Sequence, residues 1–284
     1  MTDVAIVTGA SSGIGEACAR RLHEAGFVVH AVARRVDRMA ELAAMGVHTT
    51  RADVTVDADL VGLVDGVLAE SGRVDVLVNN AGYGSYGALE DVPMAEARRQ
   101  LEVNVVALAR TTQLVLPAMR AQGSGRIVNI SSMGGRFGEP MGAWYHATKF
   151  AVEGLSDSLR MEVAPFGIHV VVVQPGSIST EWGPIAAEQL VEVSGSGPYA
   201  EQAVRSATVL TRQTDGRPTG SSPDVVARAV VHAATARRPR TRYRVGAYAK
   251  PVTLARKLLP DRVWDRTLTA SYDLEARRRG TGGG

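Results

Sequence analysis

A glycine-rich turn stands between a short apolar run and a helical pattern at the start of the chain. Residues 4–7 are continuously apolar, which is typical of a strand buried on both faces of a parallel sheet. The run TGASSGIG follows at residues 8–15, and the helical pattern after it ends near Gly26. Glycines in such a turn let the backbone approach a pyrophosphate, whose charge is favoured at a helix N-terminus. The spacing G-x-x-x-G-x-G is a variant of the common fingerprint, and its position predicts a dinucleotide site.

The chain then alternates apolar runs with helical patterns, and this alternation predicts an α/β fold with a parallel sheet. A chain of 284 residues suits one large domain of this class better than two small ones. Strands are expected at residues 4–7, 27–33, 47–50, 74–78, 126–130, 168–173 and 242–245. Helices are expected after the glycine turn and at residues 36–45, 57–70, 94–121, 144–163 and 224–236.

Three segments are less regular. The helix expected at 94–121 carries Asn104, whose amide needs partners if buried, and Pro117, which is expected to kink its end. Residues 181–222 predict a substrate lid of one or two helices, with a hinge at 214–223. Ser222 is expected to cap the next helix, with Pro223 at its first position. Residues 247–284 form a C-terminal extension, whose tail at 277–284 is expected to be disordered.

The composition argues against several classes of protein. No apolar run approaches the roughly 18 residues that a bilayer-spanning helix needs. The N-terminus has no basic region ahead of its apolar run, so it predicts a strand and not a signal peptide. The single cysteine, Cys18, excludes an intrachain disulfide and a cysteine-based metal cluster, and we interpret it as a small core residue. We therefore expect a cytoplasmic protein without a bound metal.

Basic residues are concentrated at the C-terminal end. Residues 235–284 contain 13 Lys and Arg against four Asp and Glu, although the whole chain has a net charge of only +3. Such a segment suits nucleic acid, an anionic lipid surface or the acidic face of another subunit. A solvated basic tail is the simpler interpretation. We therefore expect no nucleic-acid partner and keep a membrane surface as an alternative.

The end of the second predicted strand bears on the choice of dinucleotide. An acidic side chain at this point binds the 2′-hydroxyl of the adenosine ribose, whereas an Arg suits a 2′-phosphate. Ala33 occupies the position of the acid, and Arg34 and Arg35 follow it. A guanidinium binds phosphate through two parallel hydrogen bonds. The pair therefore favours NADP(H) over NAD(H), the alternative being that both residues merely open the next helix.

Tyr145 and Lys149 lie one turn apart on a predicted helix, so their side chains share one face. A fixed ammonium favours the phenolate, so we expect the pKa of Tyr145 to fall from about 10 toward the working range. The phenol then becomes a usable proton donor or acceptor. Ser132 follows an apolar run, and its hydroxyl suits a substrate oxygen. Taken alone, however, Tyr-x-x-x-Lys is more often part of an ordinary surface helix.

Several further motifs accompany this pair between residue 1 and about residue 180. The full set is Thr8-Gly9-x-x-x-Gly13-Ile14-Gly15, Asn79-Asn80-Ala81-Gly82, Asn104, Ser132, Tyr145-x-x-x-Lys149 and Pro175-Gly176-x-Ile178-x-Thr180. With these motifs in this order and at these spacings, the chain resembles the short-chain dehydrogenase/reductase family. The resemblance implies an oxidoreductase with a Rossmann-like, doubly wound parallel sheet of about seven strands, helices on both faces, and a single domain over residues 1–284.

The resemblance also implies roles for single residues. Tyr145 is the expected general acid or base, Ser132 positions the substrate oxygen, and Lys149 binds the nicotinamide ribose and lowers the Tyr145 pKa. Asn104 is expected to hold a water that links Lys149 to solvent. The expected cofactor contacts are Gly9, Ser11, Ser12, Gly13, Ile14, Gly15, Arg34, Arg35, Asp53, Val54, Asn80, Ala81, Gly82, Tyr145, Lys149, Pro175, Gly176, Ile178 and Thr180. The expected substrate contacts are Ser132, Met133, Tyr145 and Trp182, with Tyr83, Phe137, Met141 and Trp144 as further candidates.

The candidate pocket residues are mostly apolar, so we expect a hydrophobic ketone or secondary alcohol as substrate. The C-terminal extension resembles those of family members that act on steroid- or retinoid-like molecules. The family also implies a homodimer or homotetramer. A 3-oxoacyl or polyketide-type ketoreductase is the alternative enzyme, and a catalytically silent, cofactor-binding regulator is the alternative from another class.

Overall fold

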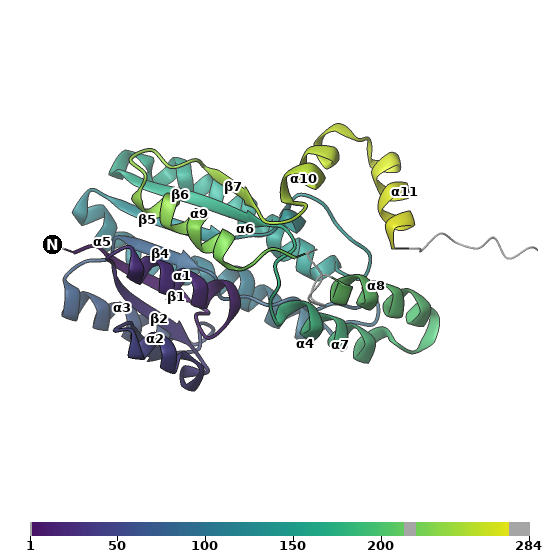
Figure 1. The fold of residues 1–284 in the computed structure, drawn as a ribbon, viewed down its shortest axis with the longest axis horizontal. Coiled ribbons are helices and arrows are strands. Elements are labelled where there is room, and N and C mark those ends of the chain that lie inside the picture. Colours follow the sequence, from purple (N-terminus) through teal and green to yellow (C-terminus); the bar gives the residue numbers. More distant parts are fainter. Residues whose placement is uncertain (1, 213–219, 273–284) are drawn as a thin grey trace, which may run out of the picture.

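A seven-stranded sheet forms the centre of the computed structural model, which describes residues 2–212 and 220–272 (Figure 1). The strands are β1 (Val4–Thr8), β2 (Val28–Ala33), β3 (His48–Arg51), β4 (Val76–Asn79), β5 (Gly125–Ile130), β6 (Ile168–Pro175) and β7 (Arg242–Val245). Their order across the sheet is β3-β2-β1-β4-β5-β6-β7, and every neighbouring pair runs parallel. The predicted doubly wound α/β fold is confirmed.

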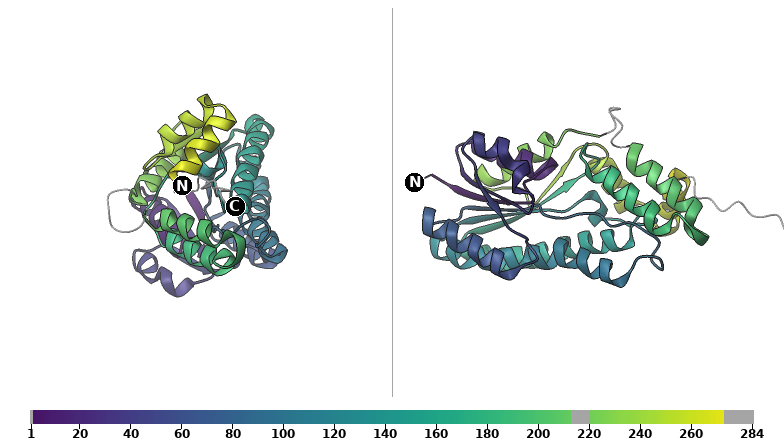
Figure 2. Two further views of the ribbon diagram at one scale, coloured as in Figure 1. Left: turned by 90° about the vertical axis from the view of Figure 1, so that its right-hand side faces the viewer. Right: turned by 90° about the horizontal axis from the view of Figure 1, so that it is seen from below.

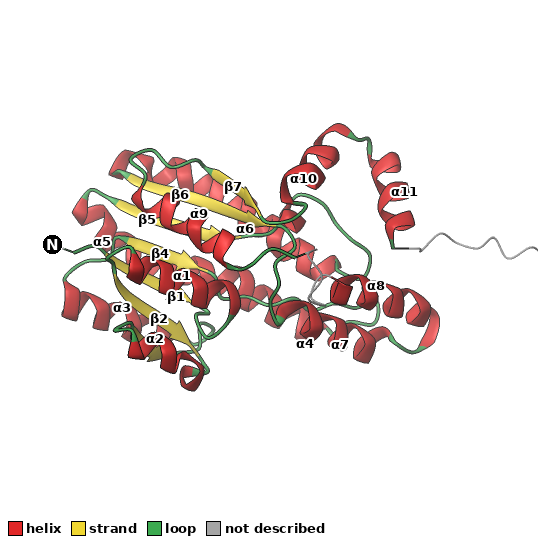
Figure 3. Ribbon diagram, viewed as in Figure 1, coloured by secondary structure: helices red, strands yellow, loops and turns green. Residues whose placement is uncertain are grey.

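Helices flank this sheet and extend beyond one end of it (Figure 3). The α-helices of the described residues are α1 (Gly13–Glu24), α2 (Ala40–Ala44), α3 (Asp57–Ser71), α4 (Met94–Leu101), α5 (Ala107–Gln122), α6 (Ala143–Val163), α7 (Trp182–Ser194), α8 (Ala200–Arg212), α9 (Asp224–Thr235), α10 (Ala249–Leu258) and α11 (Asp261–Ser271). The right-hand view of Figure 2 shows the sheet between two helix layers.

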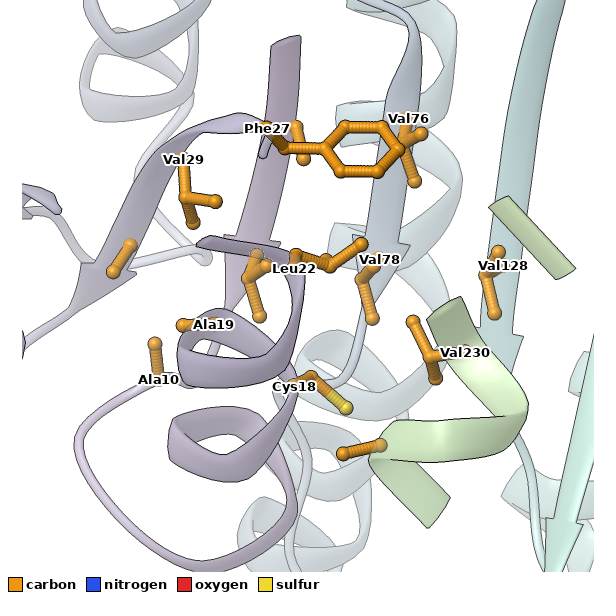
Figure 4. Packing of buried hydrophobic residues seen from close by; sticks show 14 of the residues in the cluster. Ala10, Cys18, Ala19, Leu22, Phe27, Val29, Val76, Val78, Val128 and Val230 are labelled. Carbon is orange, nitrogen blue, oxygen red and sulfur yellow. The ribbon is translucent and has the colours of Figure 1, made fainter. Parts of the chain in front are cut away.

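α1 and α9 cover one face of the sheet. Cys18 and Leu22 of α1 meet Val230 of α9 and Val78 of β4 in a single apolar cluster (Figure 4). Cys18 is fully buried, and this burial raises the pKa of its thiol to about 12. Its predicted role as a small core residue is confirmed.

α3, α5 and α6 cover the opposite face. Val64 of α3, Val115 of α5 and Leu159 of α6 pack on strand residues such as Ile6 and Ile127. The strands are apolar on both faces because helices cover both of them, which explains their continuous apolar runs.

The strand order changes direction between β1 and β4. β2 and β3 extend to one side of β1, and β4 to β7 extend to the other. Open α/β sheets bind ligands at such a point, outside the carboxyl ends of the strands. α4, α7 and α8 lie beyond this end of the sheet (Figure 1). The glycine turn after β1 and the loops after β4, β5 and β6 therefore face a common space.

The helix predicted at 94–121 is interrupted. α4 ends at Leu101, and a π-helical turn, η2 (Glu102–Val106), precedes α5. Asn104 is buried in this turn, whereas α5 continues past Pro117 to Gln122. The irregularity therefore lies at Asn104. Single π-helical turns inside α-helices are frequent at functional sites.

Two other boundaries differ from the prediction. The helix expected at 36–45 is a 3₁₀ turn, η1 (Val36–Met39), followed by the short α2. The helix after Ser222 begins at Asp224, so Pro223 precedes it and is not its first residue. The hydroxyl of Ser222 still accepts a hydrogen bond from the Asp224 N–H at 3.3 Å, so the prediction was wrong by one position only.

The predicted lid forms α7 and α8, which pack against each other. Ala187 and Leu190 of α7 and Ala203 of α8 share an apolar cluster with Tyr86 and Tyr145. The lid therefore rests on the candidate catalytic tyrosine. Most of the predicted hinge and the whole predicted disordered tail lie outside the described residues.

The C-terminal helices α10 and α11 return to the segment that follows β5. Trp264 of α11 is buried, and its ring centroid lies 5.1 Å from that of Phe137. Tyr272, directly after α11, is also buried. Among the described residues, no helix has the length and apolar character needed to cross a membrane.

Candidate active site

A cavity of about 600 Å³ lies at the carboxyl ends of the strands. The glycine turn, the loops after β2, β4, β5 and β6, the first turns of α6 and the lid helices contribute to its lining. The predicted residues that line it are Gly9, Ser12, Gly13, Ile14, Arg34, Arg35, Asn80, Ala81, Gly82, Tyr83, Ser132, Met133, Tyr145, Lys149, Pro175, Gly176, Ile178, Thr180 and Trp182. Side chains that are far apart in the sequence therefore meet at the predicted end of the sheet.

The glycine turn is shaped by positions that exclude a side chain. Gly9 and Gly13 have φ angles of +67° and +59°, which favour glycine. A Cβ atom on Gly15 would lie 2.2 Å from the carbonyl oxygen of Gly9. The turn therefore packs backbone against backbone at the N-terminus of α1, and it fits a pyrophosphate held by N–H groups. Gly15 packs against the Gly9 carbonyl and does not itself line the cavity.

Arg34 and Arg35 lie where β2 ends, and both line the cavity. The Arg34 side chain is 64% exposed, and its Nη1 is 3.9 Å from the Asp53 carboxylate. Arg35 donates a long hydrogen bond, 3.5 Å, to the hydroxyl of Ser11. Ser11, Asp53 and Val54 lie outside the cavity lining, so the structure does not place these three predicted cofactor contacts on its wall.

Tyr145 and Lys149 lie in the first two turns of α6, and both are buried. The Lys149 ammonium is 5.9 Å from the centroid of the Tyr145 ring and donates a hydrogen bond to the Ile130 carbonyl at 3.1 Å. Ser132 caps a short 3₁₀ turn, and its hydroxyl accepts from the Gly134 N–H at 3.0 Å. Ser132 therefore uses only a lone pair for this bond, and its hydroxyl also hydrogen-bonds with Tyr145.

The predicted fall in the Tyr145 pKa does not occur in the protein alone. Burial raises the pKa of Tyr145 to about 12, although a hydrogen bond with Ser132 acts in the opposite direction. Burial also lowers the pKa of Lys149 from 10.5 to about 8. The expectation was wrong because loss of water disfavours the charged form of each group, and the Glu139 carboxylate further raises the pKa of Tyr145.

Asn104 lies behind the cavity and does not line it. Its amide nitrogen donates to the Tyr83 carbonyl at 2.9 Å and to the Thr148 hydroxyl at 3.0 Å. Its amide oxygen accepts from the Tyr83 N–H at 3.0 Å. The loop after β4 and helix α6 therefore supply the hydrogen-bond partners that the buried Asn104 amide needs. A water held between Asn104 and Lys149 stays a prediction.

Aromatic rings surround Tyr145 on the lid side. The ring centroids of Trp182 and Tyr86 lie 5.2 Å and 5.5 Å from that of Tyr145. Trp182 fits there because Gly84 has no side chain, since a Cβ atom on Gly84 would come within 2.3 Å of the indole. The predicted contact residue Trp182 thus stands beside the candidate catalytic group.

Three of the further pocket candidates do not line the cavity, namely Phe137, Met141 and Trp144. Phe137 packs instead against Trp264 of the extension, and Met141 belongs to the apolar cluster beneath the lid. For Phe137 and Met141 the apolar character serves packing, which sequence alone does not distinguish from substrate contact.

Glu139 and His146 also line the cavity, and the sequence did not single them out. His146 donates from Nδ1 to the Gly134 carbonyl at 2.8 Å, which leaves its Nε2 3.6 Å from the Glu139 carboxylate. The hydroxyl of Tyr272 hydrogen-bonds to Glu139, and burial together with this carboxylate raises the pKa of Tyr272. The position of His146 next to Tyr145 was the available signal. The contact between Glu139 and Tyr272 gave no such signal, because it joins residues that are 133 positions apart in the sequence.

Residues 3–189 match the family model described as short chain dehydrogenase. This chain belongs to the short-chain dehydrogenase/reductase family. It is therefore an oxidoreductase that uses a nicotinamide cofactor. The glycine turn, whose backbone geometry leaves no room for side chains at Gly9 and Gly15, fits the phosphates of that cofactor.

Full-length relatives support the same assignment. A 3-ketodihydrosphingosine reductase of Bacteroides thetaiotaomicron is 34% identical over 271 residues, which cover 95% of this chain and 97% of the relative. An NADPH-dependent 3-dehydrocapnine reductase of Ornithobacterium rhinotracheale is 34% identical over 274 residues, covering 92% and 94%. A crystal structure of a short-chain dehydrogenase from Streptomyces avermitilis has a TM-score of 0.79 at 34% identity, over 96% of this chain and 97% of that one.

We predict that Lys149→Met stabilises the cofactor-free dehydrogenase at pH 7 by about 1–3 kcal/mol. The lower pKa of Lys149, about 8 against 10.5, means that the folded protein holds this proton less tightly than the unfolded chain. At about 1.36 kcal/mol per pH unit this cost is somewhat above 3 kcal/mol, and loss of the hydrogen bond to Ile130 offsets part of the gain. The gain is complete below pH 8, shrinks as the pH rises and vanishes above pH 10.5.

Urea unfolding at pH 7 and at pH 10 measures this difference. Lys257→Met, which removes an exposed lysine of α10, is the matched control and should change stability little at either pH. A Lys149→Met variant that is no more stable than the wild type at pH 7, or whose gain is the same at both pH values, contradicts the argument.

Proposed function

We propose that this dehydrogenase reduces a ketone or aldehyde with NADPH, with Tyr145 as the general acid. The observation that supports this most strongly is that Ser132, Tyr145 and Lys149 line one cavity together with the glycine turn and two guanidiniums. A silent cofactor-binding regulator would not need all three polar side chains at the wall of the same cavity.

Each of the three side chains has a distinct task in this proposal. The bound nicotinamide supplies the hydride. Ser132 and Tyr145 donate hydrogen bonds to the carbonyl oxygen, and Tyr145 gives up its proton as negative charge develops there. A phenol with a pKa of about 12 keeps its proton until that moment. Lys149 then stabilises the phenolate that remains, because the positive charge is already in place beside it. In alcohol oxidation the same tyrosine acts as the base.

We predict that Tyr145→Phe lowers the turnover number by about 100- to 10,000-fold, the usual contribution of a general acid. NADPH binding should stay within about threefold of the wild type, because the phenyl ring still fills the space between Tyr86 and Trp182. NADPH oxidation and fluorescence titration measure the two quantities.

Tyr86→Phe is the matched control, since it removes a buried hydroxyl from the neighbouring ring. It should retain most of the turnover. Retained activity in Tyr145→Phe would remove the tyrosine from the mechanism. No activity in the wild type, combined with tight NADPH binding, would favour the silent regulator instead.

Preference for NADP(H) over NAD(H) rests on Arg34 and Arg35. Both face the cavity at the end of β2, and no acid occupies the position that Ala33 holds. Arg34 is largely exposed and its distance to Asp53 is long, so its guanidinium can turn toward a phosphate. One of the relatives is named as NADPH-dependent.

We predict that Arg34→Ala and Arg35→Ala each raise the KM for NADPH by about 10- to 100-fold, the equivalent of a lost hydrogen bond between charged groups. The KM for NADH should change less than about threefold, since it has no 2′-phosphate. Steady-state kinetics with both cofactors measure this selectivity. Arg238→Ala, at an exposed position outside the cavity, is the control. Equal losses for both cofactors would contradict the assignment.

For the substrate, we propose a ketone with a long apolar chain and a hydrogen-bond donor or ammonium group near the carbonyl. Met133, Trp182, Ile185 and Leu210 supply apolar wall. Glu139 supplies a carboxylate close enough to Tyr145 to raise its pKa. The two relatives are named as reductases of 3-ketodihydrosphingosine and 3-dehydrocapnine, and the former compound is a long-chain amino ketone. Steroid- or retinoid-like ketones are the alternative hydrophobic substrates.

A panel of ketones distinguishes these substrates. We predict the highest kcat/KM for 3-ketodihydrosphingosine, and a lower value for its N-acylated form, a steroid ketone, a retinal and a 3-oxoacyl thioester. Glu139→Gln should lower kcat/KM for the free amine by about 10-fold or more, but should change the N-acylated form little. Preference for the thioester would instead support the oxoacyl or polyketide-type ketoreductase.

Two expectations about partners stay predictions. Exposed apolar residues on α6, such as Phe150 and Met161, suit association into a homodimer or homotetramer. Exposed Leu254 and Leu258 of α10 lie in the basic C-terminal segment, which suits contact with an anionic lipid surface. Light scattering and vesicle co-sedimentation measure these two properties.

A further inference from the structure

Two histidines and a glutamate meet on the sheet away from the active-site cavity. His30 lies within β2 and is paired in register with His48, the first residue of β3. Glu70 lies in the last turn of α3, which covers this face of the sheet. One ligand atom from each side chain falls within 4.8 Å of the other two. None of the three residues lines the active-site cavity.

His30 has an unused nitrogen at this place. The residue is 3% exposed, and its Nε2 is buried without a hydrogen-bond partner. Buried polar atoms in proteins are nearly always satisfied, so an orphaned nitrogen indicates a missing partner. A neutral imidazole is the form that binds a metal ion.

The other two side chains approach from the solvent side. The ring centroids of His30 and His48 are 4.7 Å apart. The Nδ1 atom of His48 lies 3.0 Å from the Glu70 carboxylate, and these two side chains are 42% and 52% exposed. An ion therefore reaches His48 and Glu70 directly from solvent, whereas His30 forms the buried end of the site. A coordination position would also remain for water.

We propose that His30, His48 and Glu70 bind a divalent transition metal ion, with zinc as the favoured ion. Two imidazoles and one carboxylate, with one position left open, are a ligand set that zinc commonly takes. The absence of a thiolate and the small number of oxygen ligands disfavour copper(I) and calcium.

The side-chain movement needed to coordinate zinc is small. Zinc ligands stand about 2.0–2.2 Å from the ion, so neighbouring tetrahedral ligands are about 3.3 Å apart. His48 and Glu70 are half-exposed and have room to close the present separations of up to 4.8 Å. His30 is fixed by its strand. The bound ion would tie β2 and β3 to α3, so its effect falls on stability and not on the hydride transfer.

Zinc binding to the purified full-length protein tests this proposal. After treatment with a chelator, competition against a chromophoric zinc indicator should reveal one equivalent bound with a Kd below about 10 µM, and cobalt(II) should give visible absorption bands of a four-coordinate site. His48→Ala and Glu70→Gln should each weaken zinc binding by at least about 10-fold. Zinc should raise the unfolding temperature of the wild type but not of these variants.

His169→Ala, which removes a partly buried imidazole from β6, is the matched control and should bind zinc as the wild type does. His48→Ala and Glu70→Gln change half-exposed side chains, so both variants should fold and should keep the NADPH-linked activity of the wild type. Failure of the folded wild type to bind zinc would overturn the proposal. Binding that survives both substitutions unchanged would also overturn it, because the ion would then lie elsewhere.

Discussion

The side-chain amide of Asn80 fastens the glycine turn to the neighbouring strand of the sheet. Its nitrogen donates to the carbonyl oxygens of Thr8 and Gly9 at 3.0 Å and 3.1 Å. The Thr8 hydroxyl in turn accepts from the backbone N–H groups of Asn80 and Ala81, both at 3.1 Å. These bonds join the ends of β1 and β4, where the strand order changes direction. The turn therefore has its shape before any ligand binds.

Burial then decides the proton chemistry of the site. Tyr145 and Lys149 are both removed from water, so the phenol keeps its proton and the amine holds its own less tightly. Keeping the Lys149 ammonium buried therefore costs folding free energy in the isolated protein. In the proposed reaction, a substrate oxygen that becomes negative next to Tyr145 accepts its proton, and the Lys149 ammonium then faces the phenolate that forms. Such a cost in the free protein is a common trade between stability and activity.

The sheet and the glycine turn were predictable from local patterns in the sequence, whereas most of the cavity wall was predictable only from the resemblance to the short-chain dehydrogenase/reductase family. Continuous apolar runs mark strands that helices cover on both faces, and Tyr145 and Lys149 need only one helical turn to share a face. The pKa of Tyr145 was predicted wrongly because it depends on how completely the fold excludes water. The π-helical turn at Asn104 and the contact between Tyr272 and Glu139 were also not predictable, since each is created by packing between distant segments.

Selectivity for substrate should depend on the two segments that are least regular in sequence. The lid places Trp182 beside Tyr145, and the Arg38 guanidinium holds the start of the lid through two hydrogen bonds to Glu181, at 2.6 Å and 2.9 Å. The extension reaches the same cavity from the other side, where Tyr272 contacts Glu139 and Trp264 packs on Phe137. The candidate catalytic side chains lie on α6 and in the segment just after β5, and they need not move when these outer segments vary. A change of substrate within this fold therefore requires changes in the lid and the extension, and leaves Tyr145, the proposed proton donor, in place.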